Sequence, residues 1–129
     1  MIKAKDLRIG DIVRYGKNTI TILAVHANGG VCFTDGKDQL YAEDVLLEPI
    51  LLTPEILEKN GWKKRTEGWY FMMISKYMYL SVEFGYENGI RVFLKRTTDG
   101  IYVKLNIANN VHELQHILWA LGKDANLKI

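Results

Sequence analysis

Two histidines and a glutamate near the end of the chain have the spacing of a zinc metallopeptidase. His112, Glu113 and His116 form the pattern H-E-x-x-H, in which two imidazoles on one helical face bind zinc and the glutamate activates a bound water. The longer form of the motif fails, because Trp119 and Gly122 stand where it has a glycine and a third histidine. We therefore predict that the match is coincidental and that the chain is not an enzyme and holds no metal or cofactor. The alternative, a zinc peptidase with His112 and His116 as ligands, needs a third ligand from upstream.

The segment that contains this pattern is predicted to form an amphipathic helix. Asn110, with a glutamate three residues later, resembles a capping box, and Gly122 is suited to the left-handed position that ends a helix. At about 100° per residue, His112 and His116 fall roughly opposite the apolar stripe. We expect them to face solvent or the N-terminal unit beside Trp119, as a candidate binding face. The apolar stripe comprises Leu114, Ile117, Leu118 and Leu121.

Composition limits the classes of function. The 129 residues are 48% hydrophobic, and 17 basic and 15 acidic side chains give a net charge of +2, which does not by itself indicate a nucleic-acid-binding protein. Cys32 is the only cysteine, which excludes an internal disulfide and a cysteine-rich zinc site. No run approaches the roughly 18 apolar residues of a membrane span, and the first residues are too polar for a secretory signal. We expect a cytoplasmic protein without membrane contacts.

Residues 1–50 are predicted to form a first domain of five short strands. Asn28-Gly29 and Asp35-Gly36 mark turns between strands, and Ala42–Asp44 reads as one helical turn before the last strand. This order resembles an SH3-like small β-barrel, a fold that serves many functions and so assigns none. The expected strands are Ile12–Tyr15, Thr19–His26, Val31–Thr34, Gln39–Tyr41 and Val45–Leu47.

Residues 51–129 are predicted to form a second domain, so that the fold class is α+β. Thr53 is a natural N-cap with Pro54 at the first helical position, and we expect a short helix that ends at Gly61. A four-stranded antiparallel meander follows, over Trp69–Ile74, Tyr77–Phe84, Ile90–Lys95 and Ile101–Ile107, with the C-terminal helix as its cover. The expected inward side chains are Met78, Leu80, Val82, Phe84, Ile90, Val92, Leu94, Ile101, Val103, Leu105 and Ile107.

The other face of this meander combines aromatic rings with cations, and two short basic runs (residues 63–65 and 95–96) extend it. Such a face suits single-stranded nucleic acid, because rings stack on bases and cations meet phosphates. The same residue types are enriched at protein interfaces, and they also pair across strands on any half-exposed sheet or under a second copy of the chain. We favour an unidentified protein partner, with nucleic acid as the alternative. The candidate residues are Tyr77, Tyr79, Arg91, Phe93, Lys95, Tyr102 and Lys104.

Three segments together resemble a family of short uncharacterised proteins carried in genomes and prophages of gut anaerobic bacteria. They are Leu7-Arg-Ile-Gly-Asp-x-Val13, Leu52-Thr-Pro-Glu-Ile-Leu-Glu-Lys-Asn-Gly-Trp62 and Val111-His-x-Leu-Gln-His116. The resemblance implies an accessory protein of a mobile genetic element, and it brings no activity, ligand or functional residue with it. Together with the two candidate surfaces, it predicts a non-catalytic binding or adaptor module.

Overall fold

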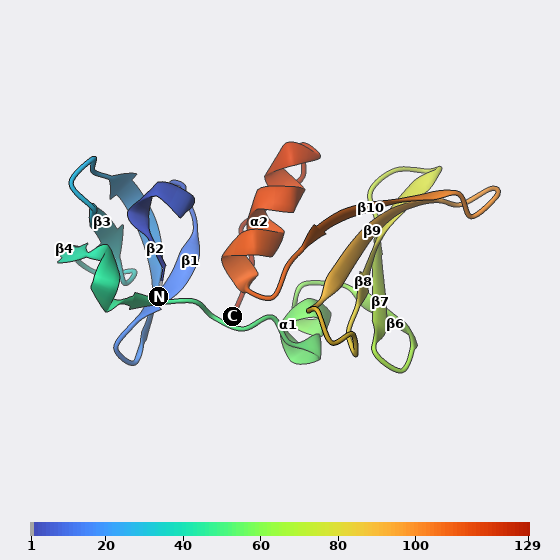
Figure 1. Cartoon of the computed structure of the whole chain (residues 1–129), viewed down its shortest axis with the longest axis horizontal. Coiled ribbons are helices and arrows are strands. Elements are labelled where there is room, and N and C mark those ends of the chain that lie inside the picture. The colour runs from blue at the N-terminus through green and yellow to red at the C-terminus, as the bar shows by residue number, and fades with distance from the viewer. Residues whose placement is uncertain (1) are drawn as a thin grey trace.

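The computed structural model describes residues 2–129 as an α+β fold with two five-stranded antiparallel sheets. A short helix connects the sheets, and the C-terminal helix stands between them (Figure 1). The first sheet contains β1 (Ile12–Tyr15), β2 (Asn18–Val25), β3 (Gly30–Thr34), β4 (Gln39–Glu43) and β5 (Leu47–Glu48). The second contains β6 (Lys63–Thr66), β7 (Trp69–Met73), β8 (Met78–Glu83), β9 (Arg91–Arg96) and β10 (Tyr102–Ile107). The helices are α1 (Pro54–Lys59) and α2 (Val111–Ala120), with short 3-10 turns η1 (Ala4–Asp6) and η2 (Asp44–Leu46).

The first sheet has the order β4-β3-β2-β1-β5, and all five strands expected from the sequence are present. The helical turn expected over Ala42–Asp44 lies two residues later, as η2, and Ala42 and Glu43 belong to β4. Val45 and Leu46 are therefore in η2 rather than in the last strand, and both side chains are exposed. Among residues 2–129, β4 and β5 do not pair with each other, so the strand ladder does not close into a barrel.

The second sheet is a meander in the order β10-β9-β8-β7-β6, with one strand more than the four expected. The prediction missed β6, where Lys63 lies opposite Phe71 and Lys64 opposite Tyr70. All four residues of β6 are exposed. An edge strand with solvent on both faces has no alternation of apolar and polar residues. The sequence of β6 therefore shows only a run of basic residues and no strand pattern.

The buried apolar side chains form two cores. One lies within residues 2–47, and the other lies between the second sheet, α1, α2 and the C-terminal tail. Leu80, Val82 and Val92 of the sheet are buried there as expected, beneath the apolar stripe of α2. The division into domains at residue 50 stays a prediction, because Ile12 of β1 is part of the second core.

Two residues of the expected inward set are exposed instead. Ile101 and Val103 have 58% and 59% of their surface open to solvent. The ten residues of α2 span only about 15 Å, and β10 runs past the helix toward the far end of the sheet (Figure 1). The helix therefore covers one end of the meander and leaves the other end of β10 open.

The helix ends follow the sequence signals. Thr53 Oγ1 accepts a hydrogen bond from the Ile56 N–H at 3.3 Å, and the Glu113 carboxylate accepts from the Asn110 N–H at 3.1 Å, as in a capping box. Gly122 takes the left-handed conformation, with a φ of 71°. Within residues 2–129, no helix is long and apolar enough to span a membrane.

Candidate binding surfaces

The outward side chains of the second sheet form rows across its strands. The register places Phe71 opposite Ser81 and Ser81 opposite Phe93, so these three share the face turned away from α2. Because alternate residues of a strand share a face, this outer face is defined by the ladder itself. It carries Trp69, Phe71, Met73, Tyr79, Ser81, Glu83, Arg91, Phe93, Lys95, Tyr102 and Lys104.

The candidate residues differ in how far they reach solvent. Tyr77 and Tyr102 are 57% and 60% exposed, and Lys104 is also exposed. Tyr77 lies in the turn just before β8 rather than in the strand. Phe93 is only 8% exposed, against the expectation of an open ring, because Tyr102 packs edge-on against it at 5.5 Å between centroids. The remaining three, Tyr79, Arg91 and Lys95, are half-buried.

A buried carboxylate lies on the outer face at the end of the central strand, β8. Glu83 is 2% exposed, and its Oε2 accepts hydrogen bonds from Ser81 Oγ and Lys95 Nζ, both at 2.9 Å. Its Oε1 accepts from the Tyr86 hydroxyl at 3.2 Å. A buried charge is tolerated when it is paired and hydrogen-bonded in this way. Alternation in the sequence places Glu83 on this face of the strand but does not indicate that it is buried or which groups it bonds.

Two cations of this face, Lys95 and Arg91, interact with other side chains of the molecule. Lys95 Nζ lies 5.0 Å from the ring centroid of Trp69 and 5.3 Å from that of Phe93, in addition to its ion pair with Glu83. The Arg91 guanidinium lies 4.0 Å from the centroid of the Tyr86 ring. Both arrangements are cation–π interactions. Neither cation is free to meet a phosphate without giving up these interactions.

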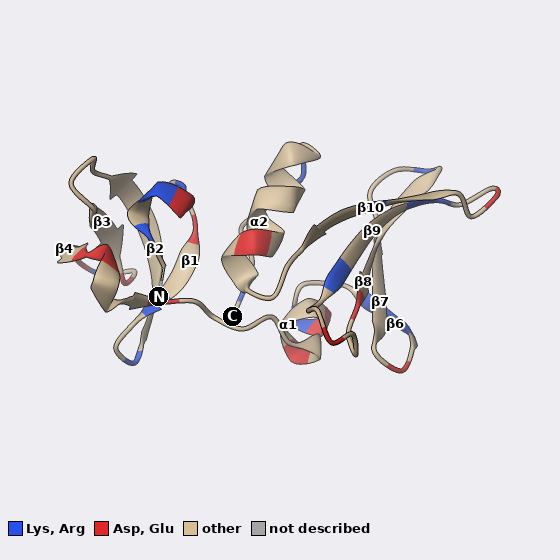
Figure 2. Cartoon of the chain, viewed as in Figure 1, with Lys and Arg blue, Asp and Glu red and all other residues tan. Residues whose placement is uncertain are grey.

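The solvent-exposed part of the outer face is mostly apolar. Met73 is 50% exposed and Trp69 37%, beside the two exposed tyrosines. A shallow cavity of about 410 Å³ opens among Arg65, Phe71, Met73, Tyr79 and Thr97. Lys and Arg mark β6 at the edge of this face (Figure 2). The prediction missed Trp69, Phe71 and Met73 because their strand is apolar on both faces, so that only the register separates outward from inward residues.

The polar face of α2 packs against the first sheet and so forms the junction between the two sheets. His116 Nε2–H donates to the Asp11 carboxylate, with 2.9 Å to each oxygen, and Asp11 is fully buried. Gln115 is also fully buried: its Oε1 accepts from the Ile12 N–H at 2.8 Å, and its amide donates to the carbonyl of Gly10 at 3.0 Å. The His116 and Trp119 rings stack at 5.9 Å. Of the two surroundings expected for His112 and His116, solvent or the N-terminal unit, the structure shows the N-terminal unit.

His112 lies deeper in the same junction. Its side chain is buried, and Nδ1 has no hydrogen-bond partner among the described residues. Burial lowers the pKa of His112 below its ordinary value, although the carboxylates of Asp11 and Glu113 act in the opposite direction. The lowered pKa favours the neutral form of this imidazole.

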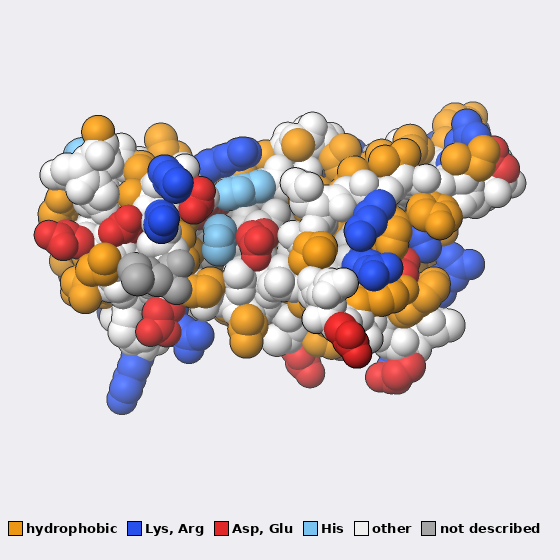
Figure 3. Space-filling view, in the orientation of Figure 1, with side chains coloured by type: hydrophobic (Ala, Val, Ile, Leu, Met, Phe, Trp, Pro, Cys, Tyr) orange, Lys and Arg blue, Asp and Glu red, His pale blue; other side chains and the backbone are white. Residues whose placement is uncertain are grey.

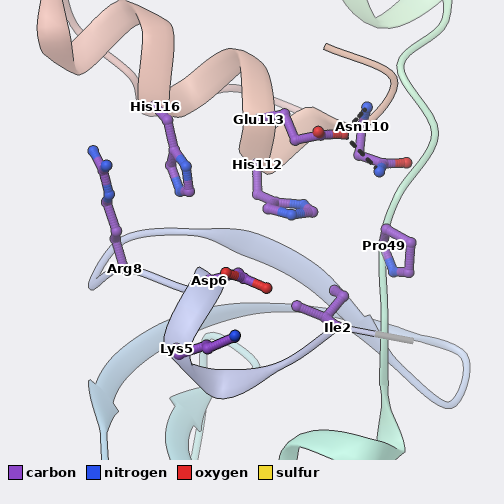
Figure 4. A pocket seen from close by; sticks show the side chains of 9 residues that line it. All are labelled: Ile2, Lys5, Asp6, Arg8, Pro49, Asn110, His112, Glu113 and His116. Carbon is purple, nitrogen blue, oxygen red and sulfur yellow. Dashed lines mark hydrogen bonds between the residues drawn. The ribbon is translucent and has the colours of Figure 1, made fainter. Parts of the chain in front are cut away.

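A polar cavity of about 480 Å³ opens between η1 and the start of α2 (Figure 4). Histidine side chains reach the surface here, between the first sheet and α2, with acidic and basic side chains on either side (Figure 3). Arg8 lies beside His116, and Asp6 faces His112 across the cavity. The lining is Ile2, Lys5, Asp6, Arg8, Pro49, Asn110, His112, Glu113 and His116.

This geometry does not suit the zinc peptidase alternative. The Glu113 carboxylate accepts hydrogen bonds from the Asn110 N–H and from its side-chain amide, at 3.1 and 2.8 Å, so it caps the helix. His116 Nε2 faces Asp11. Within residues 2–129, no three or more His, Cys, Asp or Glu side chains are grouped so as to hold a metal.

Sequence reasoning missed the partners on both sides of this junction. Asp11 was noted only within the segment of residues 7–13, and neither Asp11 nor Gln115 was assigned a role. Helical spacing does place Gln115 beside His112 and Trp119 on one face, and that signal was present in the sequence. Asp11 has no such signal, because it lies 105 residues from His116.

Comparisons with protein-family models, with curated proteins and with solved structures found no match to this chain.

Proposed function

We propose that this protein is a non-catalytic binding module that holds a protein partner on the outer face of its second sheet. The observation that carries the proposal is the exposure of Met73, Tyr77 and Tyr102 around a polar network that is satisfied internally. Tyr, Trp and Met are enriched at protein interfaces, where large side chains are removed from water. An accessory role in a mobile genetic element and a cytoplasmic location are part of the proposal and rest on the sequence alone.

In the same proposal, the first sheet acts as a scaffold. Its order β4-β3-β2-β1-β5, with a 3-10 turn before β5, supports an SH3-like arrangement of residues 2–50. Its surface toward α2 is occupied by Asp11, Ile12 and Gly10. We propose that this unit steadies α2, and with it the second sheet, rather than recognising the partner.

Single-stranded nucleic acid is the second candidate for the outer face. Exposed Lys104 and Tyr102 support it, because a ring and a cation lie side by side on one strand. The engagement of Lys95 with Glu83 and of Arg91 with Tyr86 weighs against it. A platform that neutralises fewer phosphates binds nucleic acid more weakly and with a smaller salt dependence. Protein is therefore the better supported partner.

Site-specific photo-cross-linking in the producing cell tests the proposal. A photoreactive amino acid at position 73, on the outer face, is compared with one at position 46 in η2, because Met73 and Leu46 are similarly exposed at 50% and 54%. We expect a discrete protein adduct from position 73 that survives nuclease digestion and is absent from position 46. A nuclease-sensitive adduct at position 73 would favour the nucleic-acid candidate, and no adduct specific to position 73 would refute both.

A further inference from the structure

We propose that two copies of this chain pair through β10, edge to edge and antiparallel, to form one continuous ten-stranded sheet about a two-fold axis at Val103. The proposal concerns the backbone edge of the second sheet; it shares Tyr102 with the outer face, but its argument does not use the proposed protein partner.

The two edges of the second sheet are opposite in character. At one edge, β6 presents Lys63, Lys64 and Arg65, and charged residues of this kind prevent strand addition. At the other edge, Ile101, Tyr102 and Val103 are consecutive and 58–60% exposed. β10 pairs only with β9 among the described residues, so its outer edge is unpaired. An exposed apolar edge strand is a template for another strand.

The backbone of β10 presents donors and acceptors along this edge. The Arg96 N–H donates to the Ile101 carbonyl at 2.9 Å, which makes these two residues a hydrogen-bonded pair of the β9–β10 ladder. Hydrogen-bonded and non-hydrogen-bonded pairs alternate in an antiparallel ladder. Tyr102 opposite Lys95 and Lys104 opposite Phe93 are therefore non-hydrogen-bonded pairs. The N–H and C=O groups of Tyr102 and Lys104 consequently point away from β9, to the open edge.

Charge and ring–cation pairing favour a second β10 as the partner and a register centred on Val103. A two-fold axis at Val103 places Val103 opposite Val103 of the second copy, and Tyr102 opposite Lys104 of the second copy. Both outer pairs join a ring to a cation, and all four outward backbone groups on each strand find partners. An axis at Lys104 would place two lysines face to face, which is unfavourable. Pairing of β10 with β6 of another copy would bring Lys104 to a strand of cations and would not close.

A groove of about 630 Å³ lies beside this edge, between the end of β10 and α2. Leu105 and Ile107 line one wall, and Ile117 and Leu121 line the other. In the register centred on Val103, the start of the second copy's β10, next to its β9–β10 turn, lies along this groove. The groove therefore gives each copy a second area of contact, in addition to Tyr102, Val103 and Lys104.

Sedimentation equilibrium of the full chain, with variants at position 103, tests the proposal. We expect a mass of twice 14.8 kDa at micromolar concentrations. Val103→Lys and Val103→Glu each place like charges across the axis and should raise the dissociation constant of the dimer at least about tenfold. Equal mixing of the two variants should restore a dimer that contains one copy of each, because residue 103 meets itself only in this register.

Ile9→Lys is the matched control, since Ile9 is 67% exposed in the loop before β1 and should leave the dimer unchanged. A second measurement is amide hydrogen exchange at Tyr102 and Lys104, which should slow as the protein concentration rises. A wild-type chain that stays monomeric at hundreds of micromolar, with fast exchange at both amides, would overturn the proposal. A dimer that survives Val103→Lys, or no mixed dimer from the two variants, would overturn the register.

Discussion

The junction between α2 and the first sheet and the outer face of the second sheet are built from similar residue types. Each combines aromatic rings with ionisable side chains on a regular element. At the junction, His116, Gln115 and Trp119 meet Asp11, Ile12 and Gly10, and the contact is closed within the chain. On the outer face, only the polar centre is closed, and Met73, Tyr77 and Tyr102 remain in solvent.

Residue type alone therefore does not distinguish a structural contact from the proposed binding surface. The sequence pattern marked both faces as candidates for the same reason, a cluster of rings and charges at regular spacing. The distinction depends on what each side chain touches. We therefore expect substitutions at the junction to change stability strongly, and substitutions at the open part of the outer face to change stability little and binding strongly.

Gln115→Ala should have the largest effect on stability. The buried amide bonds to the Ile12 N–H and to the carbonyls of Gly10 and Ala125. Its removal leaves the Ile12 N–H and the Gly10 carbonyl without partners, whereas the Ala125 carbonyl still accepts from the Leu127 N–H. Each unsatisfied buried group costs about 1–3 kcal/mol and the cavity left by the side chain adds to this, so we expect a loss of about 3–5 kcal/mol. Urea unfolding measures it, with exposed Asn106→Ala as the control. A loss below about 1 kcal/mol would mean that the junction is not tightly closed.

Gly10→Ala should have the next largest effect. A Cβ at Gly10 would lie 2.9 Å from Cζ2 of the Trp119 ring, and the backbone φ is 94°. Gly36 has a φ of 98° with open space around it. Gly36→Ala therefore measures the backbone strain alone, about 1 kcal/mol. Gly10→Ala should lose about 1–3 kcal/mol more by chemical denaturation, because overpacking is added. Equal losses at both glycines would contradict the close approach of Trp119 to the first sheet.

His112→Leu should change the pH dependence of stability. Burial lowers the pKa of His112 in the folded state, so below the ordinary histidine pKa of about 6.5 the unfolded chain binds a proton that the folded chain does not. Stability is therefore lost as pH falls below about 6.5, until the folded histidine also protonates.

We expect the leucine variant to lose less stability than wild type between pH 7 and pH 5, measured by urea titrations at each pH. Leu46→Ala, at an exposed position without an ionisable group, is the control that should keep the wild-type slope. The same pH slope in His112→Leu and wild type would show that His112 is accessible to protons in the folded state.

Tyr77→Ala should have the smallest effect on stability. The side chain is 57% exposed and its neighbour Lys76 lies 5.5 Å from the ring centroid. Exposed substitutions away from special backbone positions change stability by about 0.5 kcal/mol or less. Thermal unfolding should place this variant within that range of wild type. A loss of about 2 kcal/mol or more, by the same standard, would mean that the outer face is a structural contact like the junction.

Much of the fold is predictable from the sequence, because alternation, caps and Asn-Gly or Asp-Gly turns are local signals. Nine of the ten strands and both helices carry such signals. β6 does not, since its four exposed residues have no apolar side to mark a strand. The exposure of Ile101 and Val103 depends on how far α2 extends over the sheet, which is a tertiary property.

The candidate site is predictable in part for the same reason. The seven residues of the candidate sheet face were predicted from alternation, and the register places Arg91, Phe93 and Lys104 among the outward side chains. The engagement of Lys95 with Glu83 was not predicted, because alternation says which face a residue shares and not which neighbour it bonds. The pairing of His116 with Asp11 joins positions 105 residues apart and leaves no local trace.

The most direct test of the central claim is the affinity of the protein captured from position 73 for purified variants of this chain. Met73→Lys changes the open part of the outer face, and Leu46→Lys changes an equally exposed site in η2. We predict that Met73→Lys weakens binding at least about tenfold, equal to about 1.4 kcal/mol, and that Leu46→Lys binds as wild type. Equal affinity of both variants and wild type would contradict the assignment of the outer face as the binding surface.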